Sequence, residues 1–267
     1  MNNRLAGLAI FVILLGFAQG DTWVVNQSDV IQEKIDLASP GDTILVVGGP
    51  IPFNENVFAN KSLILQGIEM PVVDGGGNES SITLYADGIV IEGFVVTNYS
   101  HSEFSDEEAG IKIYSNNSII RNNIVRNDGA GFGIWMSRSS NNSIEANNIS
   151  SNEFGIMLLE SHGNRITGNV ATKNVRGIAL HDSGNNTISE NNASLNTEGF
   201  RLNISSNNTI EKNNISDGNL GIYLQSSDRN TIANNNVSIS PNLKGTGIEL
   251  INSDYNKVEG NGVSRKP

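Results

Sequence analysis

Apolar residues return at a fixed interval along most of the chain. Seven glycines followed by Ile or Phe are separated by 23, 22, 22, 22, 22 and 26 residues. An apolar residue follows each glycine, and an asparagine comes three residues later, beginning with Ile119 and Asn122. This agreement over seven units predicts a solenoid with about 22 residues in each coil. The repeated glycines are Gly110, Gly133, Gly155, Gly177, Gly199, Gly221 and Gly247.

The pattern inside one repeat predicts three short strands. In residues 155–176, inward and outward positions alternate from Ile156 to Leu159, as in a strand. Ser161–Asn164 has the composition of a turn, and Ile166 and Val170 are expected to point inward from two further strands. Three strands and three turns in each coil predict an all-β fold, the parallel β-helix.

Equivalent residues of successive coils are then expected to lie one above the other. Parallel strands are about 4.8 Å apart, so the asparagines at the turns can form hydrogen-bonded ladders along the stack. Asparagine also tolerates the left-handed backbone that sharp turns require. The predicted core columns are Ile111, Ile134, Ile156, Ile178, Phe200, Ile222 and Ile248, and Ile113, Met136, Leu158, Leu180, Leu202, Leu224 and Leu250.

The alternative fold with an overlapping period is the leucine-rich repeat. That repeat requires a frame of several leucines and usually a helical return segment. In this chain Leu is mostly confined to one column, and Asn and Ser fill the return segment. The pattern therefore favours the β-helix.

The amino-terminal part of the chain is less regular. Residues 29–39 are the best candidate for a helix, with Asp29 as its cap and Gln32 at the third helical position. Such a helix would cover the open end of the solenoid, where sheet edges are otherwise exposed. Regular coils are expected at about 110–262. No comparable cap follows Asn261, which leaves the carboxy-terminal end available to a partner.

The first 20 residues have the organisation of a signal peptide. Arg4 precedes an uncharged run of 14 residues, which is too short to span a bilayer comfortably. Ala18 and Gly20 place small residues before a cleavage site at Asp21, and an uncleaved anchor is the alternative. No later apolar run is long enough to cross a membrane. Residues 21–267 are therefore expected to form one β-helix domain that is secreted, periplasmic or held at the cell surface.

Composition and charge narrow the functional classes. The 267 residues include 40 Asn and 28 Gly, which are unfavourable in helix interiors and disfavour an all-α fold. The absence of cysteine excludes a disulfide framework and thiolate metal sites. A net charge of −11 argues against nucleic acid as a partner.

Three segments resemble the opening of NosD-like proteins of the pectin-lyase-like superfamily, namely Val30–Val47, Asn60–Gly67 and Val72–Gly76. The repeats are similar to the Asn-x-Ile-x-x-Asn-x-Ile coils of that family, the PbH1-type repeats. The resemblance covers nearly all of the chain after residue 20 and implies a right-handed single-stranded parallel β-helix. The superfamily includes pectate lyases, polygalacturonases, carbohydrate-binding modules and periplasmic copper-maturation factors. The resemblance therefore does not imply one activity.

Two acids on the strands that follow the repeated glycines are candidates for catalysis. Glu160 and Asp182 are expected to stack one coil apart, with His181 beside them. A separation of about 5 Å would suit a retaining pair of carboxylates or a metal. The alternative is a pair of solvated acids at a strand end. No multi-acid motif of the lyases or hydrolases is matched, so no catalytic residue is carried over from the family.

Aromatic and basic residues at outward positions of the same strands are candidates for carbohydrate binding. Exposed aromatic rings beside polar groups suit the apolar faces and the hydroxyls of sugars. The alternative is that these rings merely cover the sheet. The candidates are Trp135, Arg201, Tyr223 and Tyr114.

Candidate metal ligands are few. An insertion at residues 101–109 carries four acids that could bind Ca²⁺, although no EF-hand spacing is present and a solvated acidic loop is the alternative. A copper site would favour Cys, Met or several His, and the three histidines form no cluster with the methionines. Copper is therefore disfavoured as a cofactor. The four acids are Glu103, Asp106, Glu107 and Glu108.

Thirteen Asn-x-Ser/Thr sequons are present, and several recur in register with the repeat. The predicted ladder asparagines are not sequons, because the residue two positions later is an apolar core residue. The sequon asparagines are their neighbours and are expected to lie outside. The possible N-glycosylation sites are Asn26, Asn60, Asn78, Asn98, Asn116, Asn141, Asn148, Asn185, Asn192, Asn203, Asn207, Asn214 and Asn236.

Together these features predict an exported β-helix that binds polysaccharide or a surface glycan, or that serves as a structural or recognition module of the cell surface. A polysaccharide lyase or glycoside hydrolase is the enzymatic alternative. A periplasmic copper-maturation accessory of the NosD type is a third interpretation, which the small number of soft ligands disfavours.

Overall fold

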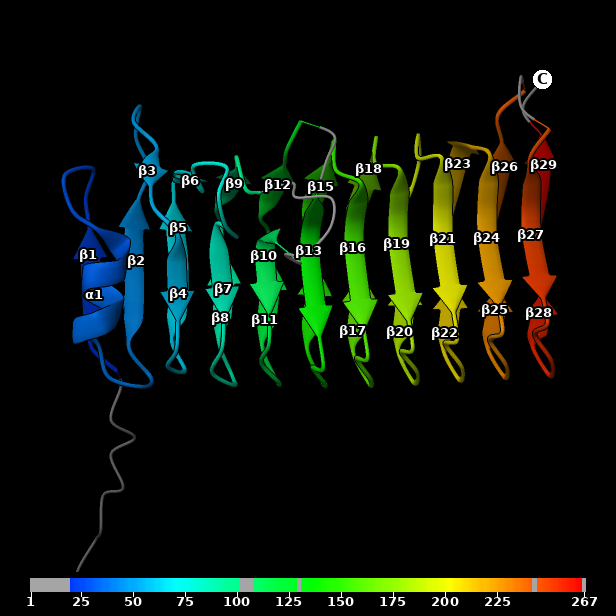
Figure 1. The fold of residues 1–267 in the computed structure, drawn as a ribbon, viewed down its shortest axis with the longest axis horizontal. Helices are drawn as coiled ribbons and strands as arrows, with labels where there is room; N and C mark the ends of the chain where they lie inside the picture. Colours follow the sequence, from blue (N-terminus) through cyan, green and yellow to red (C-terminus); the bar gives the residue numbers. More distant parts are fainter. Residues whose placement is uncertain (1–19, 101–107, 129–130, 242–243, 266–267) are drawn as a thin grey trace, which may run out of the picture.

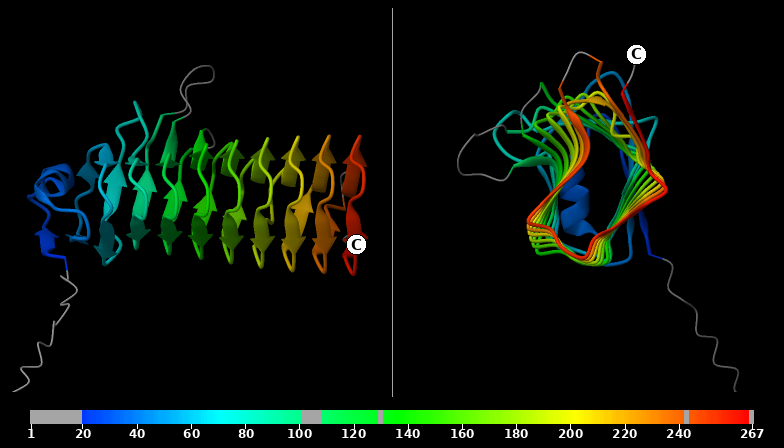
Figure 2. Two further views of the ribbon diagram at one scale, coloured as in Figure 1. Left: turned by 90° about the horizontal axis from the view of Figure 1, so that it is seen from below. Right: turned by 90° about the vertical axis from the view of Figure 1, so that its right-hand side faces the viewer.

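The computed structural model describes residues 20–100, 108–128, 131–241 and 244–265. These residues form a solenoid whose coils follow one another along a single axis (Figure 1). The paired strands run parallel, and the coils superpose around a common core when viewed along the axis (Figure 2). The predicted all-β parallel solenoid is confirmed.

The strands of successive coils line up in long sheets that run along the axis. The first sheet has eleven strands: β1 (Thr22–Val25), β2 (Thr43–Val47), β5 (Ile64–Ile68), β8 (Val90–Glu92), β11 (Ile119–Arg121), β14 (Ser143–Glu145), β17 (Arg165–Thr167), β20 (Thr187–Ser189), β22 (Thr209–Glu211), β25 (Thr231–Ala233) and β28 (Lys257–Glu259). The second has nine: β4 (Val57–Ala59), β7 (Ile82–Leu84), β10 (Ala109–Ile113), β13 (Phe132–Ser137), β16 (Phe154–Leu159), β19 (Arg176–His181), β21 (Glu198–Asn203), β24 (Leu220–Gln225) and β27 (Thr246–Ile251).

The third side of the solenoid is divided into two sheets. Six strands form the first part: β3 (Phe53–Asn54), β6 (Val72–Asp74), β9 (Val95–Thr97), β12 (Ile124–Arg126), β15 (Asn148–Ser150) and β18 (Val170–Thr172). Three strands form the second part: β23 (Asn214–Gly218), β26 (Asn236–Ile239) and β29 (Gly262–Arg265). Asn192 connects the two parts through single bridges to Val170 and Asn214.

Each coil sends apolar side chains into one continuous core. In the coil that begins at Gly155, the inward residues Ile156, Leu158 and Ile166 are completely buried. The expectation that Val170 points inward is wrong, because the neighbouring Ala171 occupies the core and Val170 is 36% exposed. The strand therefore has the opposite alternation from the one that the larger apolar side chain suggested.

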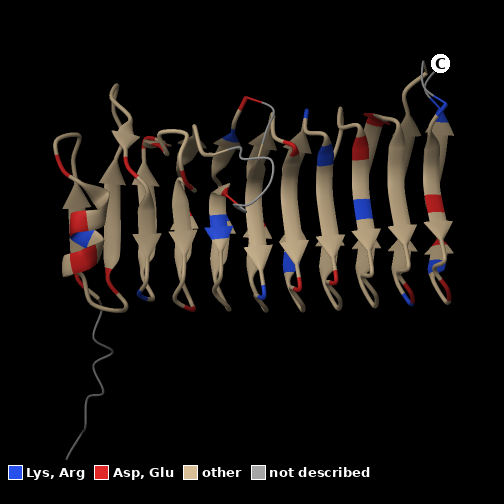
Figure 3. Cartoon of the chain, in the orientation of Figure 1, with Lys and Arg blue, Asp and Glu red and all other residues tan. Residues whose placement is uncertain are grey.

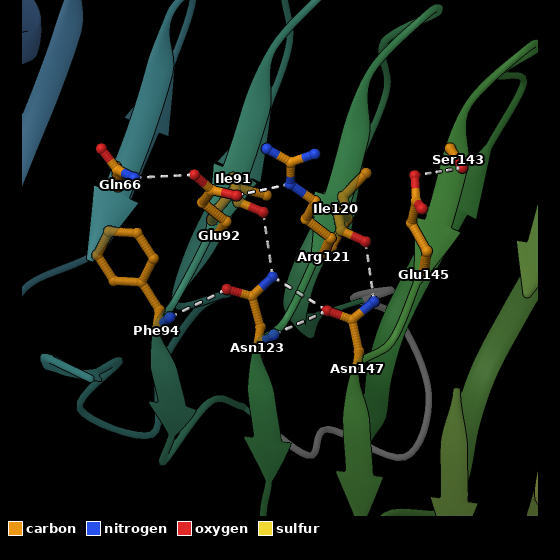
Figure 4. Close-up of polar contacts among 10 residues, drawn as sticks. All are labelled: Gln66, Ile91, Glu92, Phe94, Ile120, Arg121, Asn123, Ser143, Glu145 and Asn147. Atoms are coloured by element: carbon orange, nitrogen blue, oxygen red, sulfur yellow. Dashed lines mark hydrogen bonds and ion pairs between the residues drawn. The ribbon is translucent and has the colours of Figure 1, made fainter. Parts of the chain in front are cut away.

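Buried asparagines form ladders along the axis, as predicted. Asn147 receives hydrogen bonds from the backbone and side-chain nitrogens of Asn123, at 3.0 and 3.1 Å, and donates to Asn169 at 3.0 Å (Figure 4). The column begins at Asn123, so the expectation of Asn122 is wrong by one residue. The buried apolar partner is correspondingly Ile120, which pairs with Ile144, and not Ile119. An extra residue in this coil causes the shift.

Left-handed backbone marks the corners of the coils, but the ladder asparagines do not supply it. The residue immediately before each ladder position does, as at Ala146 (φ 53°) before Asn147 and Asn141 (φ 58°) before Asn142. The chain thus makes its sharp turn first, and the following buried amide then bonds along the stack.

One short helix, α1 (Ile31–Leu37), lies at the amino-terminal end of the solenoid, within the predicted range 29–39 but shorter (Figures 1 and 2). Its cap is Val30, and the expectation that Asp29 caps the helix is wrong. The carboxylate of Glu55 instead accepts hydrogen bonds from the backbone nitrogens of Ile31 (2.9 Å) and Gln32 (3.0 Å). A residue from the next coil thereby satisfies the free N–H groups of the first turn.

The two ends of the solenoid differ among the described residues. Helix α1 packs against β1, β2 and β4, and its Ile31 and Ile35 are buried. In the last described coil the core positions Leu250, Val258 and Val263 are 36%, 47% and 53% exposed. Within the described part of the chain, no helix is long and apolar enough to cross a membrane.

Candidate functional site

The outer face of the nine-stranded sheet carries most of the candidate residues. Its parallel register places Lys112 beside Trp135, then Met157, Ala179, Arg201 and Tyr223 in successive strands. The predicted stacking of these outward positions is confirmed. Neighbouring strands are about 4.8 Å apart, so side chains two or more coils away do not touch directly unless they are long.

A row of aromatic rings runs along the axis at the amino-terminal half of this face. The ring centroids of Phe58 and Tyr85 are 5.2 Å apart, those of Tyr85 and Tyr114 5.1 Å, and those of Tyr114 and Trp135 5.4 Å. Aromatic pairs at these separations attract one another. Phe58 is 40% and Tyr85 55% exposed, so the row presents rings to solvent at its amino-terminal end.

Trp135 does not present its ring, although its position faces away from the core. Its side chain is 1% exposed and contacts the rings of Tyr114 and Phe132. The ammonium of Lys112 lies 5.3 Å from the centroid of Trp135 and 5.4 Å from that of Tyr114. The expectation that Trp135 is exposed is therefore wrong, and its ring supports the row from beneath.

A half-buried ion pair lies beside the aromatic row. Lys112 Nζ is 3.1 Å from Glu108 Oε1, and Glu108 Oε2 accepts a hydrogen bond from Ser80 N at 2.6 Å and another from the Ser80 hydroxyl. Burial acts to raise the pKa of Glu108, but the hydrogen bonds from Ser80 and Lys112 outweigh it, so this pKa lies below its ordinary value. Burial acts to lower the pKa of Lys112, but the bond to Glu108 outweighs it and the pKa is raised.

The row and the ion pair border one groove of about 330 Å³. We call this the aromatic groove and define it by the aromatic side chains Phe58, Tyr85 and Tyr114 and the charged side chains Glu79, Glu108 and Lys112. It therefore combines apolar ring faces with fixed hydrogen-bonding groups, which is the general composition of a small-ligand site.

The predicted carbohydrate-binding residues fall into two separate groups. Tyr114 and Trp135 belong to the aromatic row, whereas Arg201 and Tyr223 lie farther along the sheet. The guanidinium carbon of Arg201 is 4.9 Å from the centroid of Tyr223, and Arg201 Nη1 is 3.1 Å from Glu198 Oε1. Three strand steps separate β13 from β21, or roughly 14 Å at the usual strand spacing, so the four residues do not form one site.

The predicted acidic pair occupies one corner of the solenoid. Glu160 (φ 48°) and Asp182 (φ 45°) are left-handed residues in successive coils, so the expected stacking is confirmed. Glu160 Oε2 is bound by Arg138 Nε at 2.8 Å, and the hydrogen bond and charge of Arg138 hold the pKa of Glu160 below its ordinary value. A nitrogen of His181, Nδ1, is 2.9 Å from Asn203 Nδ2. A retaining pair needs one carboxyl with a raised pKa, and Glu160 shows the opposite shift.

The candidate metal ligands are not brought together in the part of the chain that the structure describes. Glu103, Asp106 and Glu107 lie outside the described residues, as does His101. Glu108 is occupied by Lys112 and Ser80. Among the described residues, no group of three or more His, Cys, Asp or Glu could hold a metal ion.

The sequon asparagines lie at the surface, as expected from the register. Asn141 and Asn148 are exposed, whereas the adjacent ladder residues Asn142 and Asn147 are buried. Ten of the thirteen sequon asparagines are exposed, and the other three, Asn116, Asn192 and Asn203, are partly buried.

Sequence analysis did not find the exposed members of the aromatic row. Phe58 and Tyr85 come from the irregular coils at the amino-terminal end, which were not aligned with the regular repeats. The segment Ile82–Tyr85 (I-T-L-Y) nevertheless matches Ile111–Tyr114 (I-K-I-Y), and this match would have placed Tyr85 beside Tyr114.

Two family models match this chain. The right handed β-helix region matches residues 87–205, and the periplasmic copper-binding protein NosD matches residues 157–266. Together with the parallel coils and asparagine ladders, these matches identify the class of protein. The chain is a NosD-like right-handed β-helix repeat protein of the PbH1 type.

A curated relative and several solved structures are similar to this chain. A cell surface glycoprotein of Methanothermus fervidus is 33% identical over 87 residues, which are 32% of this chain and 15% of that protein. The alginate lyase from Paenibacillus sp. str. FPU-7 has a TM-score of 0.53 at 14% identity, over 92% of this chain and 98% of the lyase. The Dettilon tailspike protein has a TM-score of 0.61 at 12% identity, over 91% of this chain and 62% of the tailspike chain. A periplasmic alginate epimerase has a TM-score of 0.60 at 18% identity, over 91% of this chain and 55% of the epimerase. At these identities, the structural similarities show the fold alone.

The copper named in one family description does not fit the described residues. The chain has no cysteine, and His162 Nδ1 accepts a hydrogen bond from Gly184 N at 2.9 Å. No described cluster of three ligands is present. We therefore assign no copper chemistry to this chain.

Proposed function

We propose that this chain is an exported β-helix module that binds a polysaccharide or surface glycan in the aromatic groove. The observation that carries the proposal is the continuous row of Phe58, Tyr85 and Tyr114 beside the Glu108–Lys112 pair. The rings can stack on the apolar faces of sugars, and the charged groups can bond their hydroxyls. Because the row runs along the solenoid axis, a glycan lying along it would contact successive rings.

The charge of the groove favours a neutral glycan. Glu79 and Glu108 supply two carboxylates against the single ammonium of Lys112. The whole chain carries a net charge of −11, and the sheet faces in Figure 3 show few cations. A polyanionic glycan would be repelled both at long range and in the groove. We therefore propose a neutral polysaccharide as the first choice of ligand.

Binding without cleavage is better supported than catalysis. The candidate acid Glu160 is occupied by Arg138, and the lowered pKa of Glu160 opposes a role as proton donor. The names of the structural neighbours, which include a lyase and an epimerase of alginate, keep an enzyme as the alternative. That alternative predicts turnover of an acidic polysaccharide that is lost in Asp182→Asn.

The location that we propose is outside the cytoplasmic membrane, with residues 1–20 acting as a cleaved signal peptide. The relative named as a cell surface glycoprotein and the match to a periplasmic family support this location. The exposed sequon asparagines would then be available for glycosylation in a host with the enzymes for it. The apolar carboxy-terminal coil is the surface at which we place a contact with another β-helical chain.

A glycan array tests the proposed function, with affinity electrophoresis in neutral and acidic polysaccharides as a second assay. We expect retention by a neutral polysaccharide, and we expect Tyr85→Ala to weaken it by roughly 5- to 30-fold, since loss of a central ring costs about 1–2 kcal/mol. Tyr255→Ala is the matched control, because Tyr255 is 81% exposed but lies outside the groove. Binding that is unchanged in Tyr85→Ala would refute the site, and release of shortened products would support the enzyme.

A further inference from the structure

One buried carboxylate receives three N–H groups at the amino-terminal end of the solenoid. Asp42 is 5% exposed. Its Oδ1 accepts a hydrogen bond from Asp21 N at 2.8 Å, and its Oδ2 accepts from Trp23 Nε1 at 2.9 Å and from Ser39 N at 2.8 Å. These donors come from the start of the described chain, from β1 and from the segment after α1. No part of the aromatic groove is involved.

The first of these donors lies at the predicted processing site. Ala18 and Gly20 place small residues before a cleavage site at Asp21. A signal peptidase would add water across the Gly20–Asp21 peptide bond, which leaves a carboxylate on Gly20 and an amine on Asp21. That amine takes up a proton near neutral pH, since the ordinary pKa of an α-amino group is about 7.7–8.0.

We propose that Asp42 is the receiving site for the new amino terminus of the processed protein, and that the ammonium of Asp21 forms a partly buried ion pair with it. The nitrogen that cleavage converts into an ammonium already lies 2.8 Å from Asp42 Oδ1. The carbonyl oxygen of Asp21 accepts a hydrogen bond from Thr43 N at 2.8 Å, which holds this residue against β2. The pair therefore forms without rearrangement of the first coil.

The path of the uncleaved chain supports the same assignment. A side chain at position 20 would place its Cβ atom 2.0 Å from the carbonyl oxygen of Gly41. Only glycine can therefore lead into Asp21 along this path, and glycine is also an acceptable residue at the −1 position of a signal-peptide site. Cleavage removes the tight passage and adds a charge where a carboxylate waits.

The charges around this pair are few. Hydrogen bonds from Ser39 and Trp23, with a smaller effect of Lys61, hold the pKa of Asp42 below its ordinary value, so this carboxylate is ionised near neutral pH. Lys61 Nζ is itself bound to the carbonyl oxygens of Ile35, Asp36 and Ala38 at the end of α1. The side chain of Asp21 is the remaining nearby charge and belongs to an exposed residue.

The ion pair gives a defined dependence on pH. The ammonium gains a partner on folding, so its pKa is raised in the folded protein, and its stabilising effect is complete below about pH 7.7 and is lost as the pH rises through the raised value. Asp42 contributes above its unfolded pKa, and this contribution is lost as the pH falls through its lowered folded value. The pair is therefore complete between about pH 4 and pH 8.

The inference depends on export, which is part of the proposed function, but not on glycan binding. The first test is the intact mass and amino-terminal sequence of the protein recovered after export from a secreting host. We expect the sequence to begin at Asp21. A retained leader, or cleavage beyond β1, would overturn the assignment. Neither result bears on retention by a glycan, so failure of this inference and failure of the groove can be told apart.

The second test compares two purified proteins, one that begins at Asp21 and one that retains Gly20. The retained glycine moves the ammonium away from Asp42 and keeps an amide at Asp21. At pH 6 we expect the protein that begins at Asp21 to melt about 2–4 °C higher, which is the usual shift for one favourable partly buried charge pair in a domain of this size. The difference should disappear above about pH 10. Equal melting temperatures at pH 6 would overturn the proposal.

Two further measurements separate the ion pair from a general effect of chain length. In an Asp42→Asn background the two forms should melt at the same temperature at pH 6. If that variant does not fold, the pKa of the Asp21 amine can be measured in the unaltered protein by following its chemical shift against pH. A value above the ordinary range of about 7.7–8.0 supports the pair, and a value within or below that range overturns it.

Discussion

Asn147→Ala should destabilise the protein far more than Asn148→Ala, although the two residues are adjacent and the substitution is the same. Asn147 is 1% exposed and belongs to an asparagine ladder, whereas the side chain of Asn148 is exposed at the surface. The comparison therefore isolates the ladder from the loss of one asparagine in a strand.

The magnitude follows from the hydrogen bonds of the Asn147 side chain. Its Oδ1 accepts from Asn123 N at 3.0 Å and from Asn123 Nδ2 at 3.1 Å, and its Nδ2 donates to Ile120 O at 2.9 Å and to Asn169 Oδ1 at 3.0 Å (Figure 4). Alanine removes these bonds and leaves the buried amide of Asn123 without its acceptor. An orphaned buried group costs about 1–3 kcal/mol, and each further bond is worth about 1 kcal/mol net. We therefore expect a loss of about 3–5 kcal/mol for Asn147→Ala and less than about 0.5 kcal/mol for Asn148→Ala.

Urea unfolding followed by circular dichroism provides the assay, with protein made in a host that lacks N-glycosylation because Asn148 lies in a sequon. A repeat array can unfold in stages, so hydrogen exchange at the Asn123 amide supplies a local measurement. This amide should lose protection in Asn147→Ala and keep it in Asn148→Ala. Equal losses of stability in the two variants would refute the view that the ladder holds the coils together.

Two further predictions concern the ends of the solenoid. Glu55→Ala should lower the free energy of unfolding by about 1–2 kcal/mol, because Ile31 N and Gln32 N lose their capping carboxylate, whereas the exposed Glu33 of the same helix should tolerate alanine with little change; equal effects in a thermal melt would contradict the cap. Val258→Lys should reduce concentration-dependent association measured by sedimentation, because it charges the apolar carboxy-terminal coil, and a wild-type protein that stays monomeric at high concentration would contradict the proposed contact there.

The repeated coils could be predicted because each core position is occupied by the same kind of residue in unit after unit. The column from Ile134 to Leu250 needed only the spacing of the glycines. The register failed where a coil has an extra residue, so that Asn122 was taken in place of Asn123. Local side-chain size also misled the analysis, because Ala171 and not Val170 fills the core of its strand.

The candidate site was harder to predict because it depends on contacts outside the repeat. The outward direction of Trp135 follows from the strand pattern, but its burial follows from the neighbouring rings and Lys112. Phe58 and Tyr85 lie in irregular coils, so periodicity alone did not align them with Tyr114. The pairing of Glu160 with Arg138 follows from their stacking in one corner column, but only the coordinates show that Arg138 reaches the carboxylate.

The asparagine ladders also determine where this scaffold can change in length. The column from Asn123 to Asn261 and the column from Asn142 to Asn256 continue without a break, whereas the third ladder contains only Asn152, Asn174 and Asn196. The longer connections, 98–108, 127–131 and 240–245, all enter the nine-stranded sheet from the third side of the solenoid. New loops can therefore be added along this single edge, next to the aromatic groove, while the other corners keep every coil the same size. A family built on this plan can vary what it recognises without altering the frame that supports recognition.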